Sequence, residues 1–142
     1  MPELTTDDVA RWMKAANSGD IDRMVAEFAD DAVAYGILGS GPYVGKQAIR
    51  TWLSGVLVSF PDLREELKTV AVRGNEALGV ETMTGTHSGP IRTADGKEIP
   101  PTHRKFSWDL MVHLVADNNG RIKSYRLYGN PLELFRQLGL SR

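Results

Sequence analysis

The sequence predicts an α+β fold in which helices come first and an antiparallel sheet follows them. Up to residue 60, apolar residues recur three and four positions apart, which is typical of helices with one buried face. After the break at Phe60-Pro61-Asp62, the chain reads mostly as strands that are joined by turns. Because the strands follow the helices instead of alternating with them, the sheet must cover one of its faces with these early helices.

The length and charge of the chain exclude several classes of function. The chain has 142 residues, which fits one domain over positions 1–142. It carries 17 Lys and Arg against 18 Asp and Glu without a basic block, so we expect neither nucleic acid nor a membrane surface as a partner. Without cysteine, disulfides, thiolate catalysis and iron–sulfur clusters are excluded. The polar start and the lack of an apolar run of about 20 residues lead us to expect a cytoplasmic protein.

Three helices are expected in the first sixty residues. The first follows a cap at Thr5 or Thr6 and ends at Gly19, and Asp20 caps the second. A strand over 32–38 separates them from the third helix. Their expected inward residues are Val9, Trp12, Met13 and Ala16, then Ile21, Met24, Val25 and Phe28, and finally Ile49, Trp52, Leu53, Val56 and Leu57.

The remainder predicts two hairpins, a long loop and a closing helix. The first hairpin pairs 63–73 with 76–87, the second pairs 105–116 with 121–129, and residues 88–104 form the loop between them. Asn130 can cap a last helix that starts at Pro131. A strongly bent sheet with helices across its concave side would leave a pocket between the layers.

Five short motifs follow one another in an order that is found in a known family. They are Phe60-Pro61-Asp62-Leu63, Gly85-Thr86-His87-Ser88-Gly89-Pro90, Pro100-Pro101-Thr102, Gly120-Arg121-Ile122 and Gln137-Leu138-Gly139. With them the chain resembles the SnoaL-like polyketide cyclases of the NTF2-like superfamily over nearly its whole length. The resemblance implies a cystatin-like α+β cone: a strongly bent antiparallel sheet, three N-terminal helices that cover it, and a short C-terminal helix. This superfamily hosts cyclases, isomerases, hydrolases and non-catalytic binders, so activity must come from the site.

The chain departs from the family at residue 130. The cyclases carry a general acid/base Asp just before the last helix, where this sequence has Asn130 ahead of Leu134 and Gln137. The family's Glu and Trp on the preceding strand are replaced by Ser124 and Arg126. Because an Asn does not exchange protons near neutral pH, the family's acid–base mechanism does not transfer intact.

Alternation divides the last two strands into a polar face and an apolar face. The polar face carries Ser107, Asp109, Met111, His113, Ser124, Arg126, Tyr128 and Asn130, and the apolar face carries Trp108, Leu110, Val112, Leu114, Tyr125 and Leu127. In the simplest layout the apolar face meets the helices. In the layout that the resemblance implies, the polar face lines the pocket and a second subunit covers the apolar face. We favour the second layout, and with it a homodimer through the convex sheet face.

Under this layout the candidate catalytic residues are His113, Asp109, Arg126, Tyr128 and Asn130. His113, with an ordinary pKa of about 6.5, would act as general base. Asp109 and Arg126 would form an ion pair that orients water or substrate, and Tyr128 and Asn130 would donate to a developing oxyanion. Such a set suits a cofactor-free cyclase, isomerase or hydrolase that acts on a hydrophobic, oxygenated small molecule.

Each of these residues also has a purely structural interpretation. Asn130 suits a helix cap, Asp109 and Arg126 suit a structural pair, and His113 can bond a strand neighbour. His87 is expected to be structural and His103 to be solvated.

The cofactor and ligand predictions follow from spacing and from the resemblance. The three histidines lack metal-ligand spacing and no dinucleotide fingerprint is present, so no metal and no cofactor are expected. In a cone the residues Trp12, Tyr35, Trp52, Phe60 and Met111 would contact the ligand. Because position 130 lacks the acid, a non-catalytic ligand-binding module remains the alternative function, with a subunit of a larger assembly as a third.

Overall fold

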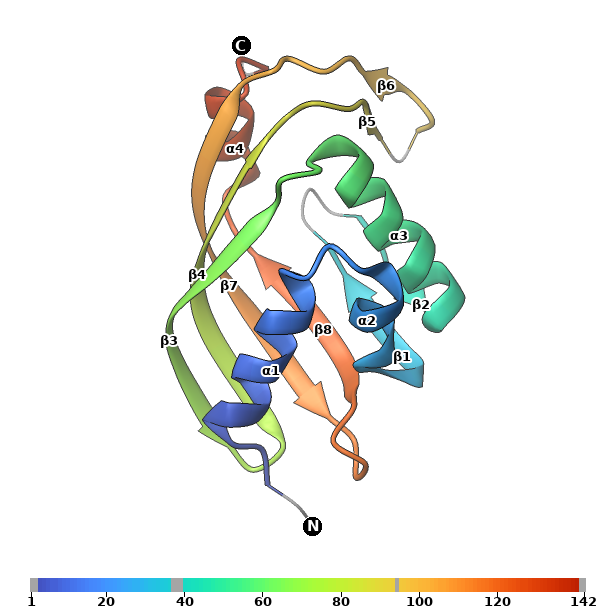
Figure 1. The fold of residues 1–142 in the computed structure, drawn as a ribbon, viewed down its shortest axis with the longest axis vertical. Coiled ribbons are helices and arrows are strands. Elements are labelled where there is room, and N and C mark those ends of the chain that lie inside the picture. Colours follow the sequence, from blue (N-terminus) through green and yellow to red (C-terminus); the bar gives the residue numbers. More distant parts are fainter. Residues whose placement is uncertain (1–2, 37–39, 94, 141–142) are drawn as a thin grey trace.

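The computed structural model describes residues 3–36, 40–93 and 95–140. Three helices lie across the concave side of a strongly curved sheet, and a fourth helix lies near one end of it (Figure 1). The helices are α1 (Thr6–Ala16), α2 (Ile21–Ala26), α3 (Lys46–Ser59) and α4 (Pro131–Gln137). The strands are β1 (Phe28–Tyr35), β2 (Tyr43–Val44), β3 (Arg64–Arg73), β4 (Glu76–Thr86), β5 (Ile91–Arg92), β6 (Glu98–Ile99), β7 (Lys105–Ala116) and β8 (Ile122–Tyr128).

Six strands form the main sheet in the order β2-β1-β8-β7-β4-β3. Neighbouring strands run antiparallel except β1 and β8, which are parallel. The short strands β5 and β6 form a separate pair inside the predicted loop. The α+β class and the bent sheet that were predicted are therefore confirmed, with one parallel pair as the exception.

The caps that the sequence predicts set the helix starts. Thr5 accepts a hydrogen bond from the Asp8 amide at 3.2 Å, Asp20 accepts from the Arg23 amide at 3.2 Å, and Asn130 accepts from the Leu132 amide at 3.0 Å. The second helix is shorter than expected, because Phe28 already belongs to β1 and packs edge-on against Tyr125. Ile37 and Leu38, at the end of the predicted strand, lie outside the described residues.

The apolar faces of β7 and β8 turn inward, toward the helices. Trp108, Leu110, Val112 and Leu114 are all nearly inaccessible to solvent, with exposures of 2 to 3 %. The layout favoured from the sequence was therefore wrong and the simpler one is right. The chain's own helices bury this apolar face, since burial of large side chains against α1 to α3 stabilises the fold without a partner. The reason for expecting a second subunit over that face no longer applies.

Candidate functional site

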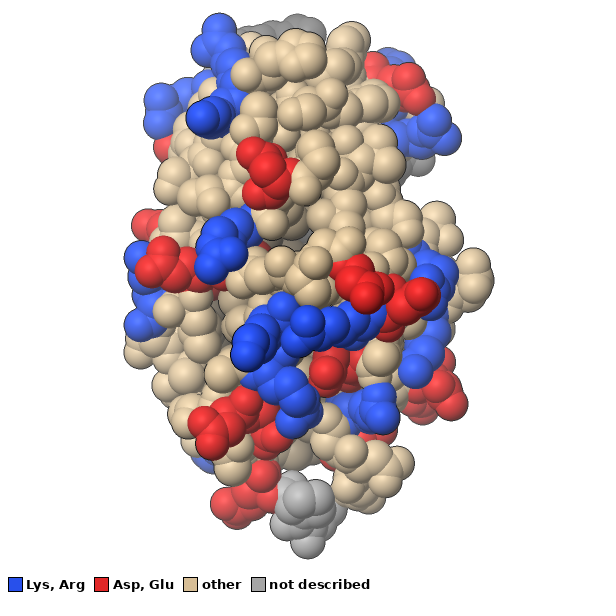
Figure 2. All heavy atoms as spheres, viewed as in Figure 1, with Lys and Arg blue, Asp and Glu red and all other residues tan. Residues whose placement is uncertain are grey.

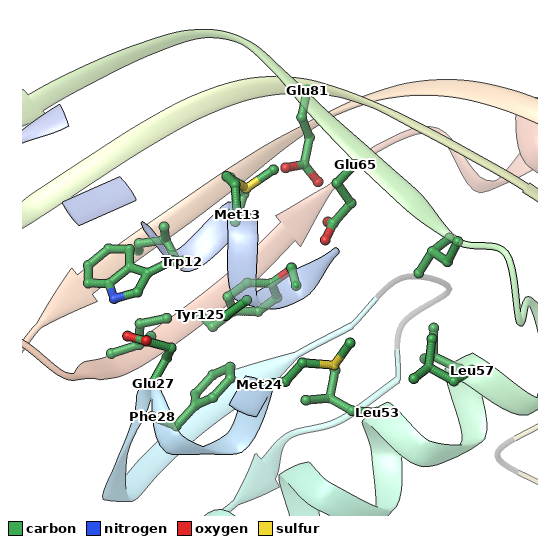
Figure 3. Close-up of a pocket in the computed structure, with 17 residues that line it drawn as sticks. Trp12, Met13, Met24, Glu27, Phe28, Leu53, Leu57, Glu65, Glu81 and Tyr125 are labelled. Atoms are coloured by element: carbon green, nitrogen blue, oxygen red, sulfur yellow. The ribbon is translucent and has the colours of Figure 1, made fainter. Parts of the chain in front are cut away.

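A small cavity lies between the three early helices and the inner face of the sheet. Its volume is about 80 Å³, and its lining is predominantly apolar. The residues around it are Trp12, Met13, Ala15, Ala16, Met24, Glu27, Phe28, Leu53, Val56, Leu57, Leu63, Glu65, Glu81, Val112, Leu114, Ile122 and Tyr125 (Figure 3). A concave, mostly apolar space with a few converging polar groups is the usual form of a small-molecule site, and the volume here is at the small end for such sites.

Two glutamates reach this cavity from neighbouring strands. Glu65 on β3 faces Met83 on β4, and Glu81 on β4 faces Leu67 on β3, so the two glutamates are diagonal neighbours on one side of the hairpin. Glu81 is 1 % exposed and Glu65 is 9 % exposed. Figure 3 shows both carboxyl groups directed into the cavity. Two acidic groups thus meet in a site where none of the described lining residues is basic.

Burial and mutual repulsion determine the charge of this pair. Burial, reinforced by the Glu65 charge, raises the pKa of Glu81 to about 10. Burial also raises the pKa of Glu65 above its ordinary value. Neither carboxyl oxygen of Glu81 has a hydrogen bond of normal geometry from the described residues. Like charges this close in an apolar site do not both ionise, so the pair retains a proton at neutral pH.

Tyr125 and Asn17 complete the surroundings of the two glutamates. Burial, with the charges of Glu65 and Glu81, raises the pKa of the Tyr125 hydroxyl well above its ordinary value, so it remains a neutral donor. The Asn17 side chain, at the end of α1, binds the backbone of Glu65 on both sides. Its Nδ2 donates to the Glu65 carbonyl at 2.8 Å, and its Oδ1 accepts from the Glu65 amide at 2.7 Å. This clamp fixes the backbone from which one carboxyl projects.

The predicted catalytic residues lie on the outer face of the sheet instead. His113 Nε2 is 3.5 Å from the Glu76 carboxylate, and the Asp109 carboxylate accepts a hydrogen bond from the Thr82 hydroxyl at 2.6 Å. The expected Asp109–Arg126 pair is not formed, because the register places Arg126 opposite His113.

Arg126 and Asn130, the remaining predicted catalytic residues with Tyr128, also lie outside the cavity lining. The Arg126 guanidinium lies 3.8 Å above the centre of the Tyr35 ring and 6.0 Å from that of Tyr128. Asn130 caps α4 and is exposed. None of His113, Asp109, Arg126, Tyr128 and Asn130 lines this cavity, because the sheet presents its other face to the helices.

The predicted ligand contacts are divided between the cavity and its surroundings. Trp12 lines the cavity. Trp52 stacks on Tyr43 with ring centres 5.1 Å apart and supports Tyr125 from behind the lining. Phe60 packs against Phe106 and His87, Tyr35 lies under Arg126, and Met111 is 37 % exposed on the outer face. Only Trp12 of this predicted set belongs to the lining.

Sequence reasoning missed both glutamates because of a β-bulge. From the Gly74-Asn75 turn as far as Thr69, the hairpin keeps one register, in which Thr69 pairs with Val80. Beyond Lys68 the register changes, and Leu67 pairs with Glu81. The extra residue shifts the register by one, which reverses the side of β3 that faces inward. Without it, Glu65 and Glu81 would point to opposite faces. The signal in the sequence was the alternation Gly79, Glu81, Met83 and Gly85 on β4, which places one charged residue among uncharged ones.

A second buried polar group, His87, lies away from this cavity. Its Nδ1 accepts a hydrogen bond from the Thr102 amide at 3.2 Å, and its ring packs on Phe60. Burial lowers the pKa of His87, so the ring is neutral near pH 7. A structural role, as expected, fits these contacts.

Two further observations concern metals and membranes. Among residues 3–36, 40–93 and 95–140, no three His, Asp or Glu side chains come together as a metal site. In the same described part of the chain, no helix has both the length and the apolar composition to cross a membrane.

A curved sheet wrapped around three helices, with a cavity between the layers, gives this protein the cystatin-like α+β fold that the sequence predicted. Within that class the chain belongs to the SnoaL-like domain family, whose family model matches residues 9–125.

Solved structures with the same fold agree with this assignment. TsrD from Streptomyces laurentii is 25% identical, with a TM-score of 0.77 over 97% of this chain and 99% of that chain. A protein of Catenulispora acidiphila with a ketosteroid isomerase-like fold is 16% identical, with a TM-score of 0.78 over 96% and 95% of the two chains. SalBIII, an epoxide hydrolase/cyclase-like enzyme of pyran ring formation in salinomycin, is 16% identical, with a TM-score of 0.74 over 90% and 92%.

Proposed function

We propose that this protein is a cofactor-free acid–base enzyme that acts on a small hydrophobic molecule bearing oxygen. The observation that carries the proposal is the pair of buried glutamates, Glu65 and Glu81, in an otherwise apolar cavity. A carboxylic acid that keeps its proton at neutral pH, beside a carboxyl that takes one up, provides an acid and a base at one site. The surface around the helices gives no competing reason for a polyanion partner, since acidic and basic side chains are interspersed there (Figure 2).

The reaction class that fits best is the opening of an epoxide by water or by a hydroxyl of the same substrate, which closes a ring. Glu81, which has the pKa of about 10, donates its proton to the epoxide oxygen as the carbon–oxygen bond breaks. The attacking hydroxyl forms the new carbon–oxygen bond and gives its proton to Glu65. Proton transfer from Glu65 to Glu81 then restores the starting state, so the cycle is balanced without a cofactor. The description of SalBIII as epoxide hydrolase/cyclase-like supports this choice.

The same pair also suits an isomerase that moves a proton next to a carbonyl. In that reaction Glu65 removes the proton, the neutral Tyr125 hydroxyl donates to the enolate oxygen, and Glu81 protonates the enolate at another carbon. Proton transfer from Glu65 to Glu81 then restores the starting state. Substrates of both kinds therefore belong in the assay.

The test is turnover of a panel of hydrophobic epoxides, epoxy alcohols and β,γ-unsaturated ketones by Glu65→Gln and Glu81→Gln. We expect each change to reduce kcat by about a hundred- to ten-thousand-fold, because each removes one proton-transfer partner. Glu66→Gln is the matched control: Glu66 is the next residue on β3, points outward and pairs with Lys68 at 3.3 Å. The proposal fails if both cavity variants keep the wild-type rate, or if His113→Ala and Asp109→Asn on the outer face lose it.

A non-catalytic binding module is the second candidate function. The observation in its favour is that Asn130, where the resemblance places an acid, is exposed and engaged as the α4 cap. This candidate predicts saturable binding of an apolar ligand and no product from the panel at any pH. Glu65→Gln and Glu81→Gln would then change affinity alone.

A further inference from the structure

The cavity contains an unused hydrogen-bond donor, the indole N–H of Trp12. Trp12 is 4 % exposed, and its Nε1 has no hydrogen-bond partner among the described residues. An indole nitrogen only donates, so it cannot be satisfied by changing its role. A buried donor without an acceptor costs free energy, and native proteins rarely leave one empty.

Trp12 lies away from the glutamate pair within the same cavity. In Figure 3 the Glu65 and Glu81 carboxyls are on one side and the Trp12 indole is on the other, with the Tyr125 ring between them. The indole nitrogen lies on the edge of the ring that faces Glu27. Besides the Tyr125 hydroxyl and the two paired glutamates, the lining contains the carboxylate of Glu27, which is already paired with Arg11, whose Nε is 3.4 Å away. The apolar cavity therefore has a polar group at each of two ends.

We propose that Trp12 Nε1 donates a hydrogen bond to an oxygen of the ligand, so that the ligand carries two oxygen functions separated by an apolar body. One oxygen meets the Glu65 and Glu81 carboxyls, and the other is a carbonyl, ether or hydroxyl that accepts from Trp12. The inference rests on the cavity being the ligand site of the proposed function. It makes Trp12 a specificity-determining residue, because a ligand without the second oxygen leaves the indole donor unpaired.

The polar residues of the cavity also restrict the charge of the ligand group that accepts from Trp12. Trp12 offers a donor only, and the nearby Glu27 carboxylate is an acceptor that repels anions. A carboxylate or phosphate at this end of the ligand would be repelled by Glu27, because Arg11 is already shared between the Glu27 and Asp8 carboxylates and leaves an excess of negative charge. A neutral acceptor is therefore favoured over an anionic one.

The experiment uses NMR to follow the indole N–H signals of the three tryptophans in protein labelled with 15N-tryptophan. Trp52 and Trp108 are internal controls, since neither lines the cavity. The probes are acetonylacetone and its longer homologues, which carry a methyl ketone at each end, and the matched monoketones of the same chain length. The methyl signals of Met13 and Met24, which line the cavity, report occupancy independently.

We expect one diketone length to move the Trp12 indole proton downfield and slow its exchange with water, while the matched monoketone moves only the methionine signals. The ratio of diketone to monoketone affinity should be roughly three- to ten-fold in the wild type and should disappear in Trp12→Phe. The wild-type spectra carry the test even if that variant folds poorly.

The other results separate this inference from the proposed function. If methionine signals respond to every probe but the Trp12 signal never does, or is already hydrogen-bonded in the free protein, the Trp12 inference is wrong and the glutamate proposal stands. If no probe moves the methionine signals, the cavity does not bind such ligands and the Trp12 inference fails, while the turnover of Glu65→Gln and Glu81→Gln still decides the glutamate proposal. If Trp12 responds but Glu65→Gln and Glu81→Gln retain full turnover, only the catalytic proposal fails.

Discussion

Glu81 is a residue in which burial and charge are strongly opposed. Its carboxyl is almost inaccessible, lies beside Glu65, and has a pKa raised to about 10 from an ordinary 4.5. The folded protein therefore holds a proton on Glu81 over a pH range in which the unfolded chain has released it. When folding raises the pKa of an acid, proton binding stabilises the folded state. This stabilisation is fully present below the pKa of the unfolded chain, and it is lost as the pH rises toward the pKa of the folded state.

Glu81→Gln should therefore remove a pH dependence from the stability of the fold. Between pH 4.5 and about 10, the free energy of unfolding of the wild type should fall with pH by up to about 1.4 kcal/mol per unit. The variant, which has no proton to retain, should gain stability relative to wild type as pH rises. Urea unfolding at a series of pH values measures this. Parallel curves for the two proteins would show that Glu81 is not held in its acid form, and Glu66→Gln should leave the dependence unchanged.

At the scale of elements, strand β3 forms one edge of the main sheet and carries Glu65. It is an edge strand, so one side of its backbone has no neighbouring strand. Asn17 replaces that neighbour at Glu65, with hydrogen bonds of 2.7 and 2.8 Å to the amide and carbonyl. The bulge next to Leu67 and this clamp together fix which way the Glu65 carboxyl points.

Asn17→Ala should cost stability and catalysis together. It leaves two partly buried backbone groups without partners, which we expect to lower the free energy of unfolding by about 1–3 kcal/mol. Turnover should fall further than stability predicts, because Glu65 loses its fixed backbone. Asn75→Ala is the control: it removes one side-chain bond, from Asn75 Nδ2 to the Ala116 carbonyl, and should cost about 1 kcal/mol with kcat unchanged. Equal effects of the two variants on kcat would contradict a positioning role for Asn17.

A second prediction at this scale concerns the passage from β8 to α4. A methyl group on Gly129 would lie only 2.8 Å from Cη2 of the buried Trp108 ring, so the chain there needs glycine for close packing. Gly129→Ala should destabilise the fold by about 1–3 kcal/mol. Gly55→Ala, in α3, meets open space and should instead stabilise by up to about 1 kcal/mol, because alanine favours helix. Thermal unfolding of both variants measures the difference, and a neutral Gly129→Ala would show that Trp108 moves freely.

At the scale of the whole molecule, local patterns predicted most of the fold but not which face of the sheet lies inward. The helix caps at Thr5, Asp20 and Asn130 and the two hairpins depend on neighbours in sequence, and these predictions are confirmed. Alternation also grouped the β7 residues correctly into two faces. Which face meets the helices is a choice between two packings, and burial of Trp108 and Leu110 decided it. The Glu65–Glu81 pair depends on a one-residue bulge between strands, which alternation alone does not reveal.

The outer face of the curved sheet still bears on assembly, although its apolar content is smaller than the sequence suggested. Met111 and Tyr128 face each other across β7 and β8 and are 37% and 50% exposed, and Leu78 on β4 is 41% exposed. None of the helices α1 to α3 reaches this side, since all three lie on the concave face (Figure 1). A homodimer through the outer face remains our prediction, now on these three side chains.

Met111→Glu tests that prediction at the centre of the patch. In a two-fold symmetric contact the same substitution enters from both copies, so it places two unpaired charges in one apolar interface. We expect the wild type to sediment as a dimer and the variant as a monomer, with the stability of the variant's fold unchanged within about 0.5 kcal/mol because Met111 points away from the core. A wild-type monomer would contradict the prediction directly. A variant that stays dimeric would show that the interface lies on another face. Neither outcome affects the cavity and its glutamates, since they lie on the opposite side of the sheet.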